Sequence, residues 1–318
     1  MIIEIENCAD SLLEAQSVLF LCHTHPDGDT LGSATALAHA LKAMGKTVAV
    51  TCDDKIPPRF DFMFKGIKQI VDFEPGLIVA VDVADTSLLG KNAELKYSEK
   101  IDLCIDHHMS NKLYASAVWL EADSASAAEM VYNLLKKMEL PITKQMASCL
   151  FTGVSTDTGC FRFANTTPRT HRIAADLIEL GADSQSLIQT FFETKSRAYA
   201  SLERMALDEM QFYLGGRCAI MPVTRAMFGK SGADDSDTDR LANLPRQVEG
   251  VLVGVTLKEQ EDGSFKASLR THGDVDASSI CARLGGGGHK GAAGVTLTVS
   301  MAQCISRLVE EIEKEIGD

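Results

Sequence analysis

Aspartate and histidine side chains follow the ends of several apolar runs in this sequence, where they could hold divalent metal ions. In chain order they are His23, Asp27, Asp29, Asp82, Asp106, His107, His108 and Asp157. Carboxylates that are buried close together repel one another and are costly to desolvate unless a cation neutralises them. Two divalent ions would balance about four such charges, and a pair of metal ions is suited to the hydrolysis of phosphate esters.

Each segment has an ordinary alternative interpretation when it is taken singly. The segment 23–29 could be a polar loop, Asp82 a strand-end aspartate and Asp157 a helix cap. In the triplet that ends with His107 and His108, the two adjacent rings point to opposite sides, so one could bind metal while the other contacts substrate. Mixed imidazole and carboxylate ligands favour manganese, iron or zinc over magnesium alone.

The elements that must position these residues alternate between strands and helices. Apolar runs predict strands at 17–22, 46–50, 77–81 and 101–105. Helical spacing predicts helices at about 30–44, 124–138, 143–155 and 168–180, the first of them capped by Thr30. This alternation predicts a mostly parallel sheet with helices on both faces, and functional sites of such sheets collect at the carboxyl ends of the strands.

A second unit follows a charged helical stretch around 185–214. It begins with predicted strands near 217–222, 248–258 and 265–270, and its glycine run 285–288 precedes His289. Glycines let backbone N–H groups approach a phosphate closely, and Arg270 ends a strand with a side chain suited to bidentate phosphate contact. A flexible turn and an exposed edge arginine remain open as alternatives.

Composition limits the classes of function. The chain has 318 residues and a net charge of −13, which is unfavourable for gripping long duplex DNA and favours a small anionic substrate. No apolar run reaches the roughly 20 residues of a membrane span, and the start has no signal-peptide pattern. The nine cysteines form no Cys-x-x-Cys pair, so buried free thiols in the cytoplasm are expected.

In order and character these segments resemble the four motifs of the DHH phosphoesterase superfamily, which is named for a triplet such as Asp106-His107-His108. The tail 285–294 resembles its DHH-associated domain, and the chain is most similar to the bacterial nanoRNase/pAp phosphatase group. The resemblance implies an α/β fold with the active site in an interdomain cleft. The implied domains are a DHH catalytic domain with a mostly parallel sheet over 1–187, a linker helix over 188–215, and a smaller substrate-binding domain with a mixed sheet over 216–318.

The resemblance also implies a role for each residue. One metal ion would be held by His23, Asp27 and Asp82. The second would be held by the side chains of Asp29, Asp82, His107 and Asp157, so that Asp82 bridges the two ions. His108 would contact the scissile phosphate, and Asp106 would orient the neighbouring histidine. The substrate-binding residues would be Arg162, Arg270, Thr271, Gly286, Gly287 and His289.

The implied activity is the hydrolysis of phosphate esters by an enzyme that uses two divalent metal ions, expected to be manganese. The substrates would be short RNA oligonucleotides, including pApA, and 3′-phosphoadenosine 5′-phosphate (pAp). The first would give 5′-mononucleotides, and pAp would give AMP and phosphate. We expect a cytoplasmic enzyme with no membrane partner, which could form a homodimer.

Four alternative activities remain to be weighed. The motifs do not separate this activity from cleavage of cyclic di-AMP, because the same metals would cut the same bond. An inorganic pyrophosphatase or polyphosphatase is less favoured, because the glycine–histidine loop replaces the lysines and arginines expected for bare phosphate chains. A RecJ-type exonuclease on long strands is disfavoured by the acidic charge. A catalytically silent nucleotide sensor is disfavoured because every motif residue is present.

Overall fold

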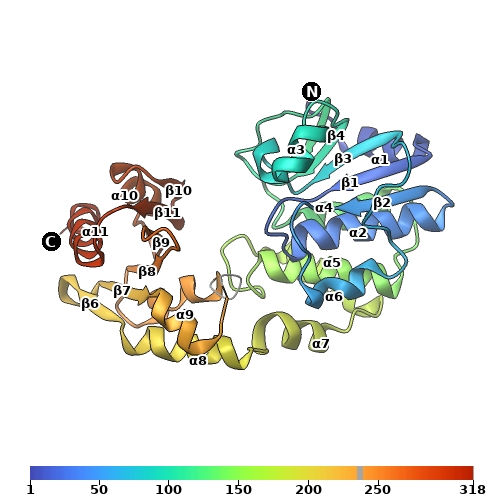
Figure 1. Ribbon diagram of the computed structural model, residues 1–318. Helices are drawn as coiled ribbons and strands as arrows, with labels where there is room; N and C mark the ends of the chain where they lie inside the picture. Colours follow the sequence, from blue (N-terminus) through green and yellow to red (C-terminus); the bar gives the residue numbers. More distant parts are fainter. Residues whose placement is uncertain (235–238, 318) are drawn as a thin grey trace. The chain divides into compact units, whose positions relative to one another are not determined.

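The computed structural model describes residues 1–234 and 239–317, which form two compact units (Figure 1). The first unit is Met1–Thr194 and the second begins at Lys195. The stretch 188–215, expected to act as a linker helix, therefore spans the boundary between them. Within the described residues, no helix is long and apolar enough to cross a membrane.

A parallel sheet of five strands forms the centre of the first unit. Its strands lie in the order β2-β1-β3-β4-β5. Their bounds are β1 Ser17–Leu21, β2 Thr47–Thr51, β3 Leu77–Val81, β4 Leu103–Asp106 and β5 Ala117–Leu120. Because side chains alternate along a strand, Phe20 of β1 lies in the core on one face and Leu21 in the core on the other. Both faces are buried, which explains the nearly continuous apolar runs in the sequence.

Helices cover both faces of this sheet, as the sequence predicts. The core on one face also contains side chains of the elements α1 Ile5–Glu14, α2 Gly28–Ala43, η1 Pro58–Phe64, α4 Ala127–Lys137, α5 Lys144–Asp157, α6 Pro168–Glu179, α7 Ser184–Ile188 and η3 Gln189–Glu193. Among these, α6 and α7 pack against α5. The other face packs against η2 Thr86–Leu89 and α3 Lys91–Tyr97. Helices α2 and α5 approach closely: a Cβ atom on Gly32 would lie 2.3 Å from the carbonyl oxygen of Cys149.

The strand order creates a point where the chain changes direction across the sheet. Strand β1 pairs with β2 on one side and with β3 on the other. Connections that leave in opposite directions open a crevice at the carboxyl ends of the two central strands, the usual ligand site of such sheets. The segment 23–29 follows β1 and Asp82 follows β3, so both reach this crevice. Asp82 adopts a φ of 61°, a left-handed conformation that is uncommon for a residue other than glycine.

The prediction that Thr30 caps the helix expected at about 30–44 is wrong. Helix α2 begins at Gly28, and the Asp27 side chain is its N-cap, accepting hydrogen bonds from the backbone N–H groups of Asp29 and Thr30. The Thr30 hydroxyl instead donates to the carbonyl oxygen of Val81 at 2.8 Å. A tertiary contact at the end of β3 therefore uses the side chain that the local pattern assigned to the cap.

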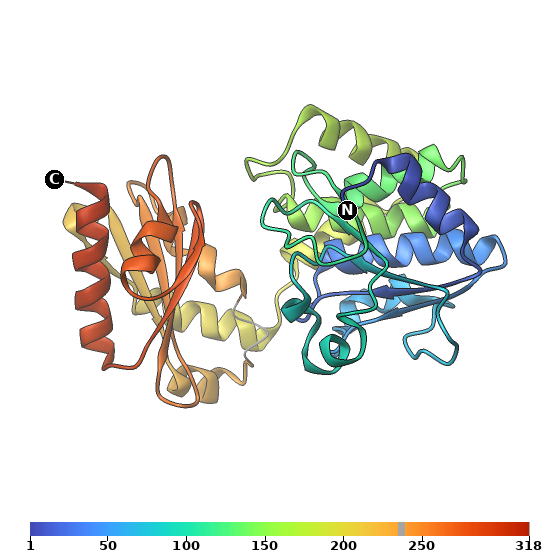
Figure 2. The same ribbon diagram turned by 90° about the horizontal axis from the view of Figure 1, so that it is seen from above.

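The second unit contains a mixed sheet in the order β10-β11-β9-β8-β7-β6. Its strands are β6 Gln211–Tyr213, β7 Cys218–Val223, β8 Val253–Glu259, β9 Phe265–Thr271, β10 Gly287–His289 and β11 Ala292–Leu297. Helices α10 Ala277–Arg283 and α11 Met301–Ile316 share the core of this sheet (Figure 2). The remaining elements are α8 Arg197–Asp208, η4 Leu214–Gly216, α9 Arg225–Ser231, η6 Asp239–Asn243 and η7 Pro245–Gln247. Helices α8 and α9 pack together in a separate small core, so α8 belongs to the second unit.

The glycine run is partly a strand rather than only a turn. Gly287–His289 pairs in antiparallel fashion with Gly294–Ala292 at the edge of the sheet. Gly288 has a φ of 147°, and a Cβ atom there would lie 2.5 Å from Ala293 Cα. The close approach of the two strands therefore requires glycine at this position.

Candidate metal centre

Three of the predicted ligands meet where β1 and β3 end. His23 Nδ1 lies 2.7 Å from the carbonyl oxygen of Thr24, which fixes the ring so that Nε2 faces the crevice. From there, Nε2 lies 3.7 Å from Asp27 Oδ1 and 3.7 Å from Asp82 Oδ2. The ligand atoms of these three side chains lie within 4.8 Å of one another, which is close enough for one ion to bind all three.

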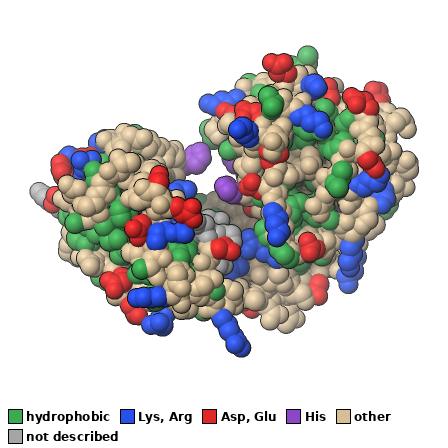
Figure 3. Space-filling model, viewed as in Figure 1, with side chains coloured by type: hydrophobic (Ala, Val, Ile, Leu, Met, Phe, Trp, Pro, Cys, Tyr) green, Lys and Arg blue, Asp and Glu red, His purple; other side chains and the backbone are tan. Residues whose placement is uncertain are grey.

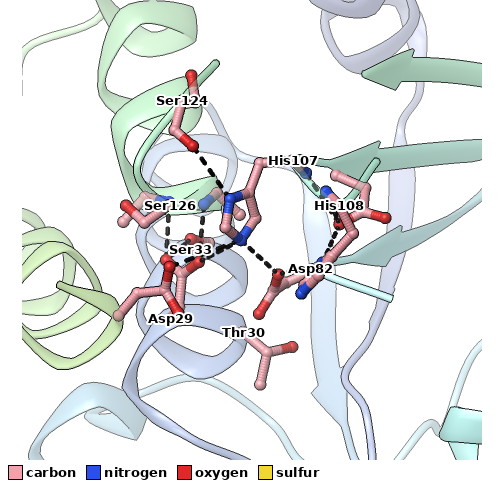
Figure 4. Close-up of polar contacts among 12 residues, drawn as sticks. Asp29, Thr30, Ser33, Asp82, His107, His108, Ser124 and Ser126 are labelled. Atoms are coloured by element: carbon pink, nitrogen blue, oxygen red, sulfur yellow. Dashed lines mark hydrogen bonds and ion pairs between the residues drawn. The ribbon is translucent and has the colours of Figure 1, made fainter. Parts of the chain in front are cut away.

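A second group surrounds His107, which follows β4 (Figure 4). His107 Nε2 lies 3.9 Å from Asp29 Oδ2, 3.5 Å from Asp82 Oδ1 and 3.7 Å from Asp157 Oδ2. Asp29 comes from the first turn of α2, and Asp157 is the last residue of α5. The two oxygens of Asp82 thus face different groups, one toward His23 and the other toward His107.

These side chains fit divalent metal ions by an independent criterion. Asp82 Oδ1 and His107 Nε2 are both buried, and among the described residues neither has a hydrogen-bond partner. Buried polar atoms are normally paired, so two such atoms that face each other require an explanation. A cation accounts for both, and imidazole with carboxylate is a donor set that suits manganese, iron or zinc.

The acidic cluster holds protons when no cation is present. Burial, and then the nearby charge of Asp82, raises the pKa of Asp29 well above its usual range. Burial likewise raises the pKa of Asp157 to about 7, against an opposing effect from His107. Burial opposes protonation of His23, but its contacts with Asp27 and Asp82 outweigh this and raise its pKa to about 11. A metal ion must therefore displace protons when it binds.

Asp106 is fully buried and acts on His108 rather than on a metal group. Its Oδ1 lies 2.8 Å from His108 Nδ1 and accepts hydrogen bonds from the backbone N–H groups of His107 and His108. Its Oδ2 accepts from Asn111 Nδ2 at 2.5 Å. The contact with Asp106 raises the pKa of His108. Because the ring is held through Nδ1 and is about two-fifths exposed, Nε2 is available to a substrate.

The sequence analysis did not predict several contacts that hold the predicted metal ligands in place. Asp29 accepts hydrogen bonds from the backbone N–H groups of Ala127 at 2.7 Å and Ala128 at 2.8 Å, the first turn of α4. His107 Nδ1 lies 3.1 Å from the carbonyl oxygen of Ser124. The pattern Ser126-Ala-Ala-Glu129 is typical of a helix N-terminus and could have located the start of α4. Asn165 donates to Asp157 Oδ2 at 3.4 Å.

The other predicted binding residues lie apart from this cluster in the chain. Arg162 follows α5, and its Nε donates to the carbonyl oxygen of Gly159 at 2.6 Å. In the second unit, Ala292 of β11 pairs with Arg270 on one side and with His289 on the other. The strand pairing therefore brings His289 level with Arg270, next to Thr271 at the end of β9. Gly287 instead pairs with Gly294, which lies opposite Ser268 within β9, and Gly286 lies beside Gly294 and Val295.

Comparisons with known proteins agree with this architecture. Residues 17–154 match the family described as DHH family, N-terminal domain, and residues 216–318 match the DHHA1 domain. The chain is 35% identical to the bifunctional oligoribonuclease and PAP phosphatase NrnA of Thermus thermophilus, covering 92% of this chain and 88% of that protein. It is 25% identical to the cyclic-di-AMP phosphodiesterase GdpP of Geobacillus thermodenitrificans, covering 96% of this chain but 47% of that protein.

The fold also matches a solved structure over nearly its whole length. An exopolyphosphatase-related protein of Bacteroides fragilis superimposes with a TM-score of 0.89 at 23% identity, covering 98% of this chain and 95% of that one. The parallel sheet, the histidine–aspartate cluster at its carboxyl edge and the second mixed-sheet unit define a two-domain phosphohydrolase. The chain belongs to the DHH family, with a C-terminal DHHA1 domain.

Proposed function

We propose that this chain uses two divalent ions, with manganese as the preferred metal, to hydrolyse short oligoribonucleotides to 5′-mononucleotides and pAp to AMP and phosphate. The observation that carries the proposal is the position of Asp82 between two ligand groups, one with His23 and the other with His107. A carboxylate that faces both groups is suited to bridge two ions, which is the arrangement that activates water and stabilises phosphoryl charge. His23 and Asp27 would complete one ion's ligands, and Asp29, His107 and Asp157 would complete the other's.

The protein's own groups would orient the reaction. The carbonyl oxygen of Ser124 can only accept, so the proton of a neutral His107 lies on Nδ1, and Nε2 would offer its lone pair to a metal ion. Asp106 holds a proton on His108 Nδ1 and favours the charged imidazolium. His108 would then donate from Nε2 to a phosphoryl oxygen and stabilise the negative charge that develops there.

The preference for short substrates rests on charge and on the relatives. On the face of the molecule in Figure 3, acidic and basic side chains are interspersed, and the chain as a whole has a net charge of −13. Such a surface attracts a long polyanion weakly, and a local metal centre suffices for a small one. The NrnA relative is named for short-RNA and pAp hydrolysis and matches nearly the whole chain. We assign the rest of the nucleotide to Arg270, Thr271 and His289 of the second unit, within the proposed domain 216–318.

The test is a competition of substrates in the presence of Mn²⁺. Purified protein is given equal concentrations of pApA, a five-nucleotide RNA, pAp, cyclic di-AMP and pyrophosphate, and the initial rates are measured. We expect mononucleotides from pApA and RNA, AMP from pAp, and little turnover of pyrophosphate. Preferred cleavage of cyclic di-AMP would instead favour a cyclic-di-AMP phosphodiesterase, the activity for which the relative matched over 47% of its length is named.

Two variants make the test specific to the metal centre. Asp82→Asn keeps the shape of the side chain and removes its charge. Asp10→Asn makes the same change on the exposed surface of α1 and serves as the control. Full activity in a folded Asp82→Asn protein would contradict the bridging role, and preferred cleavage of pyrophosphate would contradict the assignment of substrate.

A further inference from the structure

One arginine of α6 reaches the segment that holds the metal-centre residues in place. Arg169 Nη2 donates to Ser124 Oγ at 2.9 Å and to the carbonyl oxygen of Asp123 at 3.1 Å. Its Nε donates to Glu129 Oε2 at 3.2 Å. The planar guanidinium therefore joins the turn before α4 to the first turn of that helix, a geometry that the point charge of a lysine does not reproduce.

Glu129 is the buried part of this arrangement. Its side chain is 0% exposed, and its Oε2 also accepts a hydrogen bond from the backbone N–H of Ala125 at 3.2 Å. A buried carboxylate is costly unless it is paired and hydrogen-bonded, and loss of one partner leaves the other as an uncompensated charge. Arg169 supplies the positive charge, so the position of the segment 123–129 depends on it.

Two predicted metal ligands depend on the same segment (Figure 4). The carbonyl oxygen of Ser124 accepts from His107 Nδ1 and so sets the direction of Nε2. Just beyond it, the N–H groups of Ala127 and Ala128 bind both oxygens of Asp29. A shift of this segment would therefore move an imidazole and a carboxylate that belong to the same metal group.

We propose that Arg169 is a positioning residue for the metal centre. It binds Glu129 and Ser124, and through them it keeps the segment 123–129 where His107 and Asp29 can share one ion. The inference rests on the proposed metal centre and adds a residue that contacts no ligand side chain itself. Partners of metal ligands typically contribute about 10- to 100-fold to metal affinity. Because Arg169 lies one contact further out, we expect a loss of about 10-fold when it is replaced.

The test measures Mn²⁺ binding rather than catalysis. The metal-free wild-type protein, Arg169→Lys and Arg169→Ala are titrated with Mn²⁺, and free Mn²⁺ is followed by electron paramagnetic resonance. Arg169→Lys keeps a cation for Glu129 but cannot serve Ser124 at the same time, so we expect its dissociation constant to rise about 10-fold. Arg172→Ala, on the exposed surface of the same helix, is the matched control and should bind like the wild type.

Two further measurements separate positioning from loss of stability. Lys46→Met removes donors to the end of α1, far from this segment in the chain, and should lower stability while leaving Mn²⁺ affinity unchanged. Added guanidinium ion should restore much of the affinity lost by Arg169→Ala. Folded Arg169→Lys and Arg169→Ala proteins that bind Mn²⁺ like the wild type would overturn the proposal. A wild-type protein that binds no Mn²⁺ would instead overturn the proposed function, and the positioning role with it.

Discussion

The contact between α5 and the metal centre can be tested with a single methyl group. Gly153 lies in α5 and is buried. A Cβ atom at this position would lie 2.6 Å from Ala128 Cβ and 2.9 Å from Asp29 Oδ1. Both distances are shorter than real contacts allow, so the substitution Gly153→Ala must displace the Asp29 carboxylate, the start of α4, or both.

The two effects of this substitution on stability oppose each other. Alanine is favoured over glycine inside a helix by roughly 1 kcal/mol, whereas overpacking a core costs roughly 1–3 kcal/mol. We therefore expect the free energy of unfolding to fall by up to about 2 kcal/mol. Displacement of Asp29 should also weaken Mn²⁺ binding by about 10-fold, which corresponds to about 1.4 kcal/mol.

The assay compares two glycines in helices. Unfolding in urea is followed by circular dichroism and by the fluorescence of Trp119, the single tryptophan, which is buried in the first unit. Gly229 of α9 is exposed and has open space around it, so Gly229→Ala should gain up to about 1 kcal/mol. If Gly153→Ala is as stabilising as Gly229→Ala and leaves Mn²⁺ affinity unchanged, the packing argument is wrong.

Four further predictions follow from contacts around the sheet. Asp82→Asn should abolish tight Mn²⁺ binding and lower kcat/KM by about 10³-fold or more, roughly 4 kcal/mol, with Asp10→Asn unchanged in both assays. Because Asp157 has a pKa of about 7 and His107 of about 10 without metal, Mn²⁺ should release protons on binding. Its affinity should therefore rise with pH between about 6 and 8, and calorimetry in buffers of different protonation enthalpy would contradict this if it found no proton release. In the metal-free protein, the free energy of unfolding should fall as the pH rises from about 4 through about 7. The reason is that the Asp157 carboxyl binds its proton more tightly in the folded state than in the unfolded state. Lys46→Met should lower the free energy of unfolding by about 1–3 kcal/mol, because it leaves carbonyl oxygens of Leu12 and Ala15 without their donor; thermal or urea unfolding at wild-type stability would contradict it.

The sequence predicts which residues lie at the carboxyl ends of the strands better than it predicts the contacts that hold those residues in place. Apolar runs specify buried parallel strands, and parallel strands place their carboxyl ends together, so Asp82 and His107 could be expected to meet. The N-cap of α2 was harder to predict, because Asp27 and Thr30 are both residues that favour the N-cap position. The choice depends on the carbonyl oxygen of Val81, which belongs to another strand.

Contacts between distant helices were not visible in the sequence. Glu129 and Arg169 are 40 positions apart, and each is an ordinary residue for the solvent-facing side of a helix. Only the packing of α6 beside α4 turns Glu129 inward and gives it a cation. The strand within the glycine run was missed for a similar reason, because β10 is defined by its pairing with β11 and not by β-branched side chains.

At position 82, the backbone conformation that favours stability and the side chain needed for activity require different residues. Its φ of 61° costs a residue with a Cβ atom roughly 1 kcal/mol or more, and glycine would relieve that cost. Glycine would also remove the carboxylate that faces both ligand groups. Selection for heat resistance alone would therefore favour glycine at position 82, and the resulting protein would be inactive. A screen for thermostable variants should measure turnover as well as melting temperature.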